Sequence, residues 1–188
     1  MIQKHEIDVP TLETERLILR KLTLNDVEDL FAYASKPQVS RYVPWDVHKS
    51  IEDSQHFLES ITNAYKEKGK LTWAIELKSE GKMIGTIDYV NWSPDHFKAE
   101  IAYVLSHHYW GRGMTTEASQ KLLEYGFGTL GLNRVEGRIM LENKQSQRVL
   151  EKLGMTFEGV ARQTLFIKGK FIDIANYALL REEFTPSL

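Results

Sequence analysis

The sequence has no cysteine and no long hydrophobic run. Its 188 residues include none that can form a disulfide, a thiolate zinc site or a cysteine nucleophile. No segment reaches the roughly 18 consecutive apolar residues expected of a membrane-spanning helix, so we expect no membrane partner. Residues 1–10 also lack the apolar core of a signal peptide. These absences favour a cytoplasmic protein.

The chain also has little excess of either charge. The net charge is −2, and lysine and arginine are scattered along the chain. Proteins that bind nucleic acid usually carry a basic stripe, so we expect no nucleic-acid partner, although a local patch for a small phosphorylated ligand stays open. His107 and His108 are adjacent, and adjacent histidines seldom converge on one ion. We therefore predict no metal site.

What is present is an ordinary globular composition, with 42% hydrophobic and 27% charged residues, which predicts one domain. Alternation of apolar and polar residues predicts a strand at 16–22. Residues 23–26 resemble a cap for a helix that runs through Ala34 and is stopped by Lys36-Pro37. Ser50 and Asp53 cap a second helix that Gly69 ends. Its apolar face comprises Ile51, Phe57, Leu58, Ile61 and Tyr65.

The remaining pattern predicts how the sheet is built. Strands at 71–77, 83–92 and 98–105 are separated by turn formers, which indicates an antiparallel meander. The later elements are a helix at about 115–130, a strand at 134–141, a helix at 146–153 capped by Gly154, and strands at 157–166 and 171–180 joined by a turn at 168–170. An antiparallel front half and a βαβα back half predict an α/β fold with a mixed sheet and helices on its faces.

The connector "HHYWGRGMTTEA" at 107–118 joins a predicted strand to a predicted helix. The first N–H groups of a helix lack partners and carry partial positive charge. Gly111 and Gly113 would let an anion approach these groups, and Arg112, Thr115 and Thr116 would add charge and hydroxyl donors. The alternative is a tight junction in which the glycines only relieve strain. Position 116 is threonine, and no Gly-Lys-Ser/Thr occurs, which disfavours Rossmann and P-loop nucleotide sites.

Three segments together resemble a known family. Residues 100–105 (EIAYVL) and 109–118 (YWGRGMTTEA) resemble the acetyl-CoA-binding core of the GNAT N-acetyltransferases. Residues 12–20 (LETERLILR) are similar to the opening of the ribosomal-protein N-terminal acetyltransferase branch, the RimJ/RimL type. Residues 142–155 (ENKQSQRVLEKLGM) resemble the Asn-x-x-Ser helix of that branch. The likeness covers about residues 11–184.

The resemblance implies one N-acetyltransferase domain over 1–188, with a mixed, mostly antiparallel sheet splayed between its fourth and fifth strands and helices on both faces. Acetyl-CoA would lie in the opening as co-substrate. Its pantetheine arm would pair with the end of strand four, and its diphosphate would rest on N–H groups at about 112–117. The implied cofactor-binding residues are Tyr103, Val104, Leu105, His108, Gly111, Arg112, Gly113, Met114, Thr115, Thr116, Asn143 and Arg148.

Three positions depart from the family pattern. His108 stands where the family often has Gln or Arg, and Met155 replaces a common aromatic residue. Leu150 occupies the position of a tyrosine that protonates the departing thiolate in many relatives. The branch that this sequence resembles places a serine one turn earlier, which falls on Ser146.

Acetyl transfer to an amine requires an unprotonated amine, a cradled carbonyl oxygen and a protonated leaving thiol. Glu100 is the candidate base, acting directly or through water; the alternative is a solvent-facing strand residue. Ser146 would protonate the thiolate, and Asn143 would hydrogen-bond the pantetheine or the reacting carbonyl, unless both only cap a helix. A main-chain N–H near Val104 would stabilise the oxyanion. Arg148 would reach the 3′-phosphate, or lie on a solvated helix face.

The acceptor is constrained by amine chemistry. A protein α-amine has a pKa of about 7.7–8.0 against about 10.4 for lysine, so freeing a lysine at neutral pH costs roughly 3.5 kcal/mol more. One candidate carboxylate therefore favours a protein N-terminus, such as that of a ribosomal protein. A small-molecule amine and a non-catalytic acyl-CoA-binding module remain alternatives, as do a monomer and a homodimer. Four aromatic residues are candidates to line the acceptor groove, although such residues are more often core: Tyr42, Trp45, Trp92 and Phe97.

Overall fold

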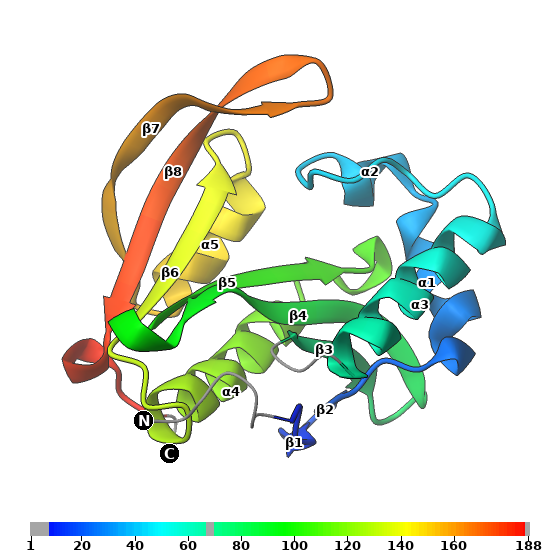
Figure 1. The fold of residues 1–188 in the computed structure, drawn as a ribbon, viewed down its shortest axis with the longest axis horizontal. Coiled ribbons are helices and arrows are strands. Elements are labelled where there is room, and N and C mark those ends of the chain that lie inside the picture. Colours follow the sequence, from blue (N-terminus) through cyan, green and yellow to red (C-terminus); the bar gives the residue numbers. More distant parts are fainter. Residues whose placement is uncertain (1–7, 67–69, 187–188) are drawn as a thin grey trace.

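The computed structural model describes residues 8–66 and 70–186, and its centre is a single eight-stranded sheet (Figure 1). The strands are β1 (Leu12–Glu13), β2 (Leu17–Arg20), β3 (Leu71–Leu77), β4 (Lys82–Ser93), β5 (Lys98–Leu105), β6 (Arg134–Met140), β7 (Thr156–Ile167) and β8 (Lys170–Leu180). Their spatial order is β1-β2-β3-β4-β5-β6-β8-β7. Only the β5–β6 pair is parallel. The prediction of a mixed, mostly antiparallel sheet is confirmed.

Helices cover both faces of this sheet. The α-helices are α1 (Val27–Ala34), α2 (Pro37–Ser40), α3 (Ile51–Lys66), α4 (Met114–Gly128) and α5 (Lys144–Lys152). Alternate residues of β3 face different cores: Trp73 packs in a cluster with residues of α4, whereas Ala74 packs in a cluster with residues of α1 and α3. This period-two alternation is what a strand requires when both of its faces are buried.

Most predicted elements form, with revised ends. β3 spans the predicted 71–77, and the meander of β3, β4 and β5 is antiparallel as expected. The first long strand is only Leu17–Arg20, shorter than 16–22, and the predicted cap at 23–26 leads into a short 3₁₀ turn before α1. Helix α4 is Met114–Gly128 rather than about 115–130. The predicted end of α3 at Gly69 lies outside the described residues.

Two differences have clear local causes. Lys36-Pro37 does follow the end of α1, but Pro37 is also the first residue of the unpredicted helix α2. Proline suits that position because the first N–H of a helix has no intrahelical acceptor. Helix α5 starts at Lys144 and not at Ser146, because Asn143 caps it. The unpredicted β1 is only two residues long and pairs with β2.

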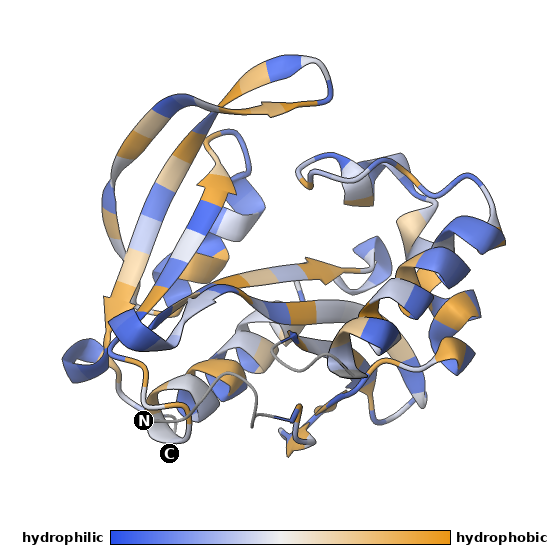
Figure 2. Cartoon of the chain, in the orientation of Figure 1, coloured by the Kyte–Doolittle hydropathy of each residue, from blue (hydrophilic) through white to orange (hydrophobic). Residues whose placement is uncertain are grey.

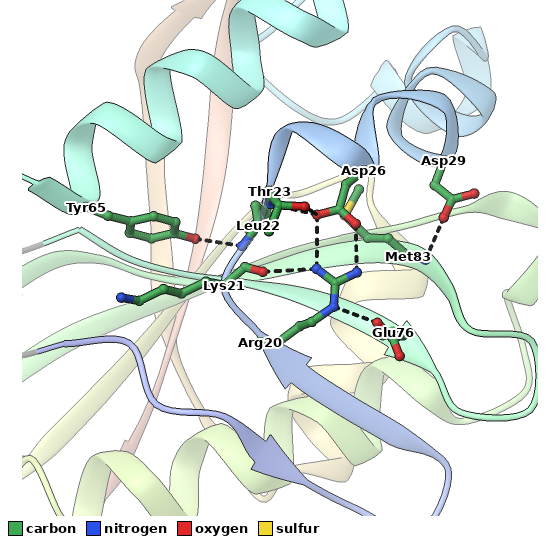
Figure 3. A network of polar contacts seen from close by, with 9 residues as sticks. All are labelled: Arg20, Lys21, Leu22, Thr23, Asp26, Asp29, Tyr65, Glu76 and Met83. Atoms are coloured by element: carbon green, nitrogen blue, oxygen red, sulfur yellow. Dashed lines mark hydrogen bonds and ion pairs between the residues drawn. The ribbon is translucent and has the colours of Figure 1, made fainter.

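A partly buried ion-pair network fixes the route from β2 into α1 (Figure 3). The Arg20 guanidinium donates to Asp26 at 2.7 and 3.0 Å and to Glu76 of β3 at 2.6 Å. Asp26 also accepts a hydrogen bond from the Thr23 main-chain N–H at 2.7 Å. Removing one partner of a buried charge pair is costly because the other charge stays desolvated. The network therefore holds β2, β3 and the start of α1 together.

The sheet opens between β5 and β6. Their parallel register runs from Lys98 opposite Arg134 to Ile101 opposite Gly137, and it stops there. Beyond this point β5 continues to Leu105, while β6 stays paired with β8 up to Met140 opposite Ile174. The two strands diverge visibly in Figure 1. Leaving out the short β1, this is the predicted splay between the fourth and fifth strands.

Candidate active site

The opening between β5 and β6 contains a cavity of about 680 Å³, within the usual size range of ligand pockets. Its lining comes from the end of β5, the glycine connector, the start of α4, β6 and α5, together with residues in and after α2 and in the β7–β8 hairpin. The structure brings most of the predicted site residues to this cavity. They are Glu100, Tyr103, Val104, Leu105, Gly111, Gly113, Met114, Thr115, Thr116, Asn143, Ser146 and Arg148.

His108 and Arg112 are the predicted residues that do not line the cavity. Both are exposed. The His108 ring lies 3.9 Å from the His107 ring, centroid to centroid, and the Arg112 guanidinium carbon lies 5.5 Å from the Tyr109 ring. A contribution of Arg112 to cofactor binding would therefore come from its main chain in this arrangement.

The glycine connector has a backbone that glycine alone adopts easily. Gly111 has φ +74° and Gly113 has φ +78°, and Gly113 is the N-cap of α4. A Cβ on Gly111 would meet no atom within 4 Å, and a Cβ on Gly113 would meet only Arg16, at 3.6 Å. The left-handed backbone thus explains both glycines, while the space beside them stays open. The first turn of a helix has N–H groups without intrahelical acceptors, and such groups can bind an anion of the size and charge of a diphosphate.

Tyr103 and Trp110 fix the end of β5 beside the opening. The Trp110 indole Nε1 donates to the main-chain oxygen of Leu105 at 2.8 Å, which ties the connector to the strand. The Tyr103 hydroxyl reaches α5 and donates to the main-chain oxygen of Ser146 at 3.3 Å. Burial raises the pKa of Tyr103 above its ordinary range, although Ser146 opposes the shift, so the phenol stays protonated. The prediction for Tyr103 concerned its main chain and missed this side-chain bridge.

Glu100 is buried beside the opening. Its side chain is only 12% exposed, so the alternative of a solvent-facing strand residue is wrong. Burial raises its pKa, whereas a 2.9 Å hydrogen bond from Asn91 and the Arg138 guanidinium, 3.8 Å away, oppose the shift. A carboxylate whose pKa is raised toward neutrality is a better proton acceptor than an ordinary glutamate.

Asn91 was not predicted as a site residue. It has φ +50° and lies where the β4–β5 register shifts between Val90 and Ser93. Such a bulge can re-aim a side chain, and here the Asn91 amide meets Glu100. The available sequence signal was an asparagine inside a strand, where that residue type is disfavoured.

Asn143 and Ser146 begin α5 at the cavity. The Asn143 side-chain oxygen accepts the main-chain N–H of Ser146 at 3.1 Å, so the predicted capping role of Asn143 is confirmed. Helix α5 lies directly on β6, since a Cβ on Gly137 would come within 2.8 Å of Leu150. Both Asn143 and Ser146 also line the cavity, so capping is compatible with the predicted roles in catalysis.

The part of the lining that comes from α2, the segment after it and the β7–β8 hairpin is called the acceptor side below. It is built mainly from segments that were not predicted to meet. Of the four candidate aromatics only Tyr42 lines the cavity. Trp92 is buried in the core, Trp45 packs on the α1–α3 core, and Phe97 is 45% exposed elsewhere. The other residues of this side are Gln38, Val39, Val43, Pro44, Leu165, Ile167 and Ile174.

The β7–β8 hairpin arches from the sheet toward α2 (Figure 1). At its turn, Lys168 Nζ donates to the main-chain oxygen of Ser40 at 2.6 Å, which joins the hairpin to the end of α2. Hydrophobic and hydrophilic residues alternate along the hairpin (Figure 2). Phe166 and Phe171 are paired near its turn and about two-thirds exposed (65% and 66%).

Two features of residues 8–66 and 70–186 bear on other functions. Nowhere in these ranges do three or more side chains of the metal-ligating types come together. Nor does this part of the chain contain a helix with the length and apolarity needed to cross a membrane.

Comparison with known proteins agrees with this geometry. The family model "Acetyltransferase (GNAT) domain" matches residues 16–156. "Uncharacterized N-acetyltransferase YoaA" of Bacillus subtilis (strain 168) is 36% identical over 172 residues, which cover 92% of this chain and 97% of the relative. "Putative ribosomal N-acetyltransferase YdaF" of the same organism is 36% identical over 105 residues, covering 56% of this chain and 57% of the relative.

A solved structure gives the same result for the fold. The GNAT-family acetyltransferase from Bacillus anthracis superposes with a TM-score of 0.82 at 31% identity, over 93% of this chain and 100% of that one. With a family model that covers most of the chain and a relative similar along nearly its whole length, the chain belongs to the GNAT family of acetyl-CoA-dependent N-acetyltransferases.

Proposed function

We propose that this enzyme acetylates the α-amino group of a peptide or protein N-terminus, such as that of a ribosomal protein. The observation that carries the proposal is the charge of the cavity lining. Among its lining residues Glu100 is the only carboxylate, against the cations Arg138, Arg148 and Lys152. A single buried base suits a single amine whose pKa is already near neutrality.

A polyamine fits this lining less well. One relative, which is 25% identical over 108 residues and 57% of this chain, is named spermidine N(1)-acetyltransferase and comes from Escherichia coli (strain K12). Spermidine carries several positive charges, and burying a charge without an opposite partner is expensive. Apart from Arg148, which is proposed to meet the cofactor, the lining has two cations and one carboxylate, which would repel such a ligand. Apolar residues opposite, such as Val39 and Leu165, suit a peptide side chain instead.

The proposed cofactor site uses the backbone of the glycine connector. The diphosphate of acetyl-CoA would be held by main-chain N–H groups at about 112–117, and its pantetheine arm by the free edge of β5 at Tyr103–Leu105. The space beside Gly111 supports this, because a Cβ there would meet no protein atom within 4 Å and the space is open to a ligand. Arg148 lines the same cavity and is proposed to meet the 3′-phosphate.

In the reaction, a C–N bond forms to the acetyl carbon and the C–S bond breaks. Glu100 accepts a proton from the attacking amine, directly or through water. Ser146 donates a proton to the departing thiolate and recovers one from solvent. A main-chain N–H near Val104 stabilises the oxyanion, and Asn143 orients the pantetheine or the carbonyl. Burial of Glu100 supports its role, because its raised pKa makes it a stronger base.

The test has two steps. First, thermal unfolding is followed with and without acetyl-CoA; ligand at 100 times its Kd should stabilise the protein by about 2.7 kcal/mol. Second, thiol release is measured with peptides that have free N-termini, the same peptides Nα-acetylated but containing lysine, and spermidine. We expect turnover of the free N-termini alone. Turnover of spermidine alone would reject the peptide proposal, and binding without thiol release from any amine would indicate a non-catalytic module.

A further inference from the structure

Glu117 lies in the first turn of α4, and residues of the β1–β2 segment surround its carboxylate. One oxygen accepts the Thr14 hydroxyl at 2.6 Å and the main-chain N–H of Arg16 at 2.9 Å. The other accepts Arg16 Nε at 2.6 Å and pairs with Nη2 at 2.6 Å. Hydrogen bonds between a guanidinium and a carboxylate are charge-assisted and stronger than neutral ones. The turn before β2 is thus tied to the helix that starts at the glycine connector.

The same guanidinium also touches the connector itself. Arg16 Nη1 donates to the main-chain oxygen of Arg112, the residue between the two glycines, at 3.0 Å. A Cβ on Gly113 would lie 3.6 Å from Arg16 Nη2, so the guanidinium packs alongside the connector. Arg16 therefore links Glu117 to the carbonyl of Arg112, and one side chain fixes both the helix start and the glycine segment before it.

A glycine connector needs such a restraint to bind well. Glycine has more conformational freedom to lose than any other residue, so a connector that must order itself on binding lowers affinity. Glu117 also places a negative charge in the turn that would face a diphosphate. Although burial acts to raise it, hydrogen bonds from Thr14 and Arg16 hold the pKa of Glu117 below its ordinary value, so the group stays ionised. Arg16 compensates that charge beside the anion site.

We propose that Arg16 and Glu117 form a clamp that holds the glycine connector in its diphosphate-binding conformation, with Arg16 as the positioning residue. This rests on the proposed cofactor site at 112–117. The clamp acts on the diphosphate half of acetyl-CoA and not on the thioester. Its loss should therefore weaken binding of the whole carrier while the acetyl-transfer step keeps its rate.

The test compares acetyl-CoA with S-acetylpantetheine, a thioester that lacks the diphosphate. We expect Arg16→Gln and Glu117→Gln each to raise the KM for acetyl-CoA about tenfold, the effect of losing a charged hydrogen bond, and to leave kcat within about twofold. Neither should change the KM for S-acetylpantetheine. Arg16→Lys, which keeps the charge, should recover part of the loss. Equal effects on both thioesters, or none on acetyl-CoA, would overturn the clamp.

Arg20, at the far end of the strand that follows Arg16, provides a matched control. It also bonds two carboxylates, those of Asp26 and Glu76, but does so at the end of β2 that leads into α1 (Figure 3). Arg20→Gln should lower the melting temperature and leave the KM for acetyl-CoA unchanged. If it raises that KM as much as Arg16→Gln does, the effect is general loosening and the clamp is wrong. If the wild-type enzyme uses both thioesters with the same KM, the cofactor site itself fails.

Discussion

The two sides of the cavity are built by different means. The cofactor side uses short segments around Gly111–Thr116, Tyr103–Leu105 and Asn143–Ser146, and its proposed ligand contacts are largely main-chain groups at the ends of regular elements. The acceptor side uses apolar side chains from segments more than a hundred residues apart, joined where Lys168 meets Ser40. A main-chain site depends on glycines and helix ends, which a sequence displays. A side-chain surface between remote segments leaves no comparable pattern.

The largest expected effect tests whether the cofactor side depends on its glycines. We expect the double variant Gly111→Ala, Gly113→Ala to lose more than about 100-fold in kcat/KM for acetyl-CoA. Each alanine would be forced into a left-handed conformation at a cost of about 1–2 kcal/mol, and the Cβ at position 111 would enter the open space that the diphosphate is proposed to fill. Steady-state kinetics with varied acetyl-CoA measures this.

Gly81 supplies the matched control. It has φ +60° in the turn between β3 and β4, with no atom near its Cβ position. Gly81→Ala should therefore cost about half the stability that the double variant loses and leave the KM for acetyl-CoA unchanged. If the double variant instead kept its affinity for acetyl-CoA, the glycines would be needed for the turn alone, and the contrast between the two sides would lose its basis.

The residues that meet around the glycine connector and the start of α5 could be predicted for a local reason. Gly111, Gly113 and the Asn143 cap are each defined by a few neighbouring residues, and the structure brings them to one cavity. The Arg16–Glu117 pair was missed because about a hundred positions separate its members, and no spacing rule connects them. Asn91 was missed because a bulge, not the alternation of its strand, aims it at Glu100.

The fold likewise divides into features set by neighbouring residues, which could be predicted, and features set by tertiary packing, which could not. The strand at 71–77 and the meander that it starts were predicted from local alternation and turn residues, and they formed as expected. Pro37 was predicted to end a helix, but the fixed φ of proline also suits the first residue of a helix, and Pro37 begins α2. Trp92 was a pocket candidate and is core, since residue type alone does not say which face of a strand is covered. Burial is decided by tertiary packing.

The second prediction concerns Glu100, which lies where the two sides meet. Glu100→Gln should lower kcat about 100-fold, the lower end of what general base catalysis contributes. Because burial raises the pKa of Glu100, the acid limb of kcat/KM in the wild type should lie above the ordinary glutamate pKa. A pH–rate profile measures both effects. An unchanged kcat would show that the amine loses its proton elsewhere.

Glu100→Gln should lower kcat, but it should raise the stability of the protein at neutral pH. A carboxyl whose folded pKa is raised favours folding below its ordinary pKa, and this contribution is lost as pH rises through the folded value. Glu100→Gln should therefore raise the melting temperature at pH 7–8 and have little effect at acid pH. Glu136 is the control: burial acts to raise its pKa, but Arg134 and Lys98 hold it below the ordinary value. Glu136→Gln should thus destabilise the protein at neutral pH.

The smallest expected effect belongs to the acceptor side. Lys168→Met keeps the length of the side chain and removes its hydrogen bond to Ser40, which holds the β7–β8 hairpin against α2. One such bond contributes about 0.5–1.5 kcal/mol, so we expect the KM for the acceptor peptide to rise about threefold while the KM for acetyl-CoA is unchanged. Lys170→Met, an exposed lysine just past the same turn, should change neither constant. A rise in the KM for acetyl-CoA instead would mean that the hairpin also shapes the cofactor side, and the two sides would then have to be treated as one site.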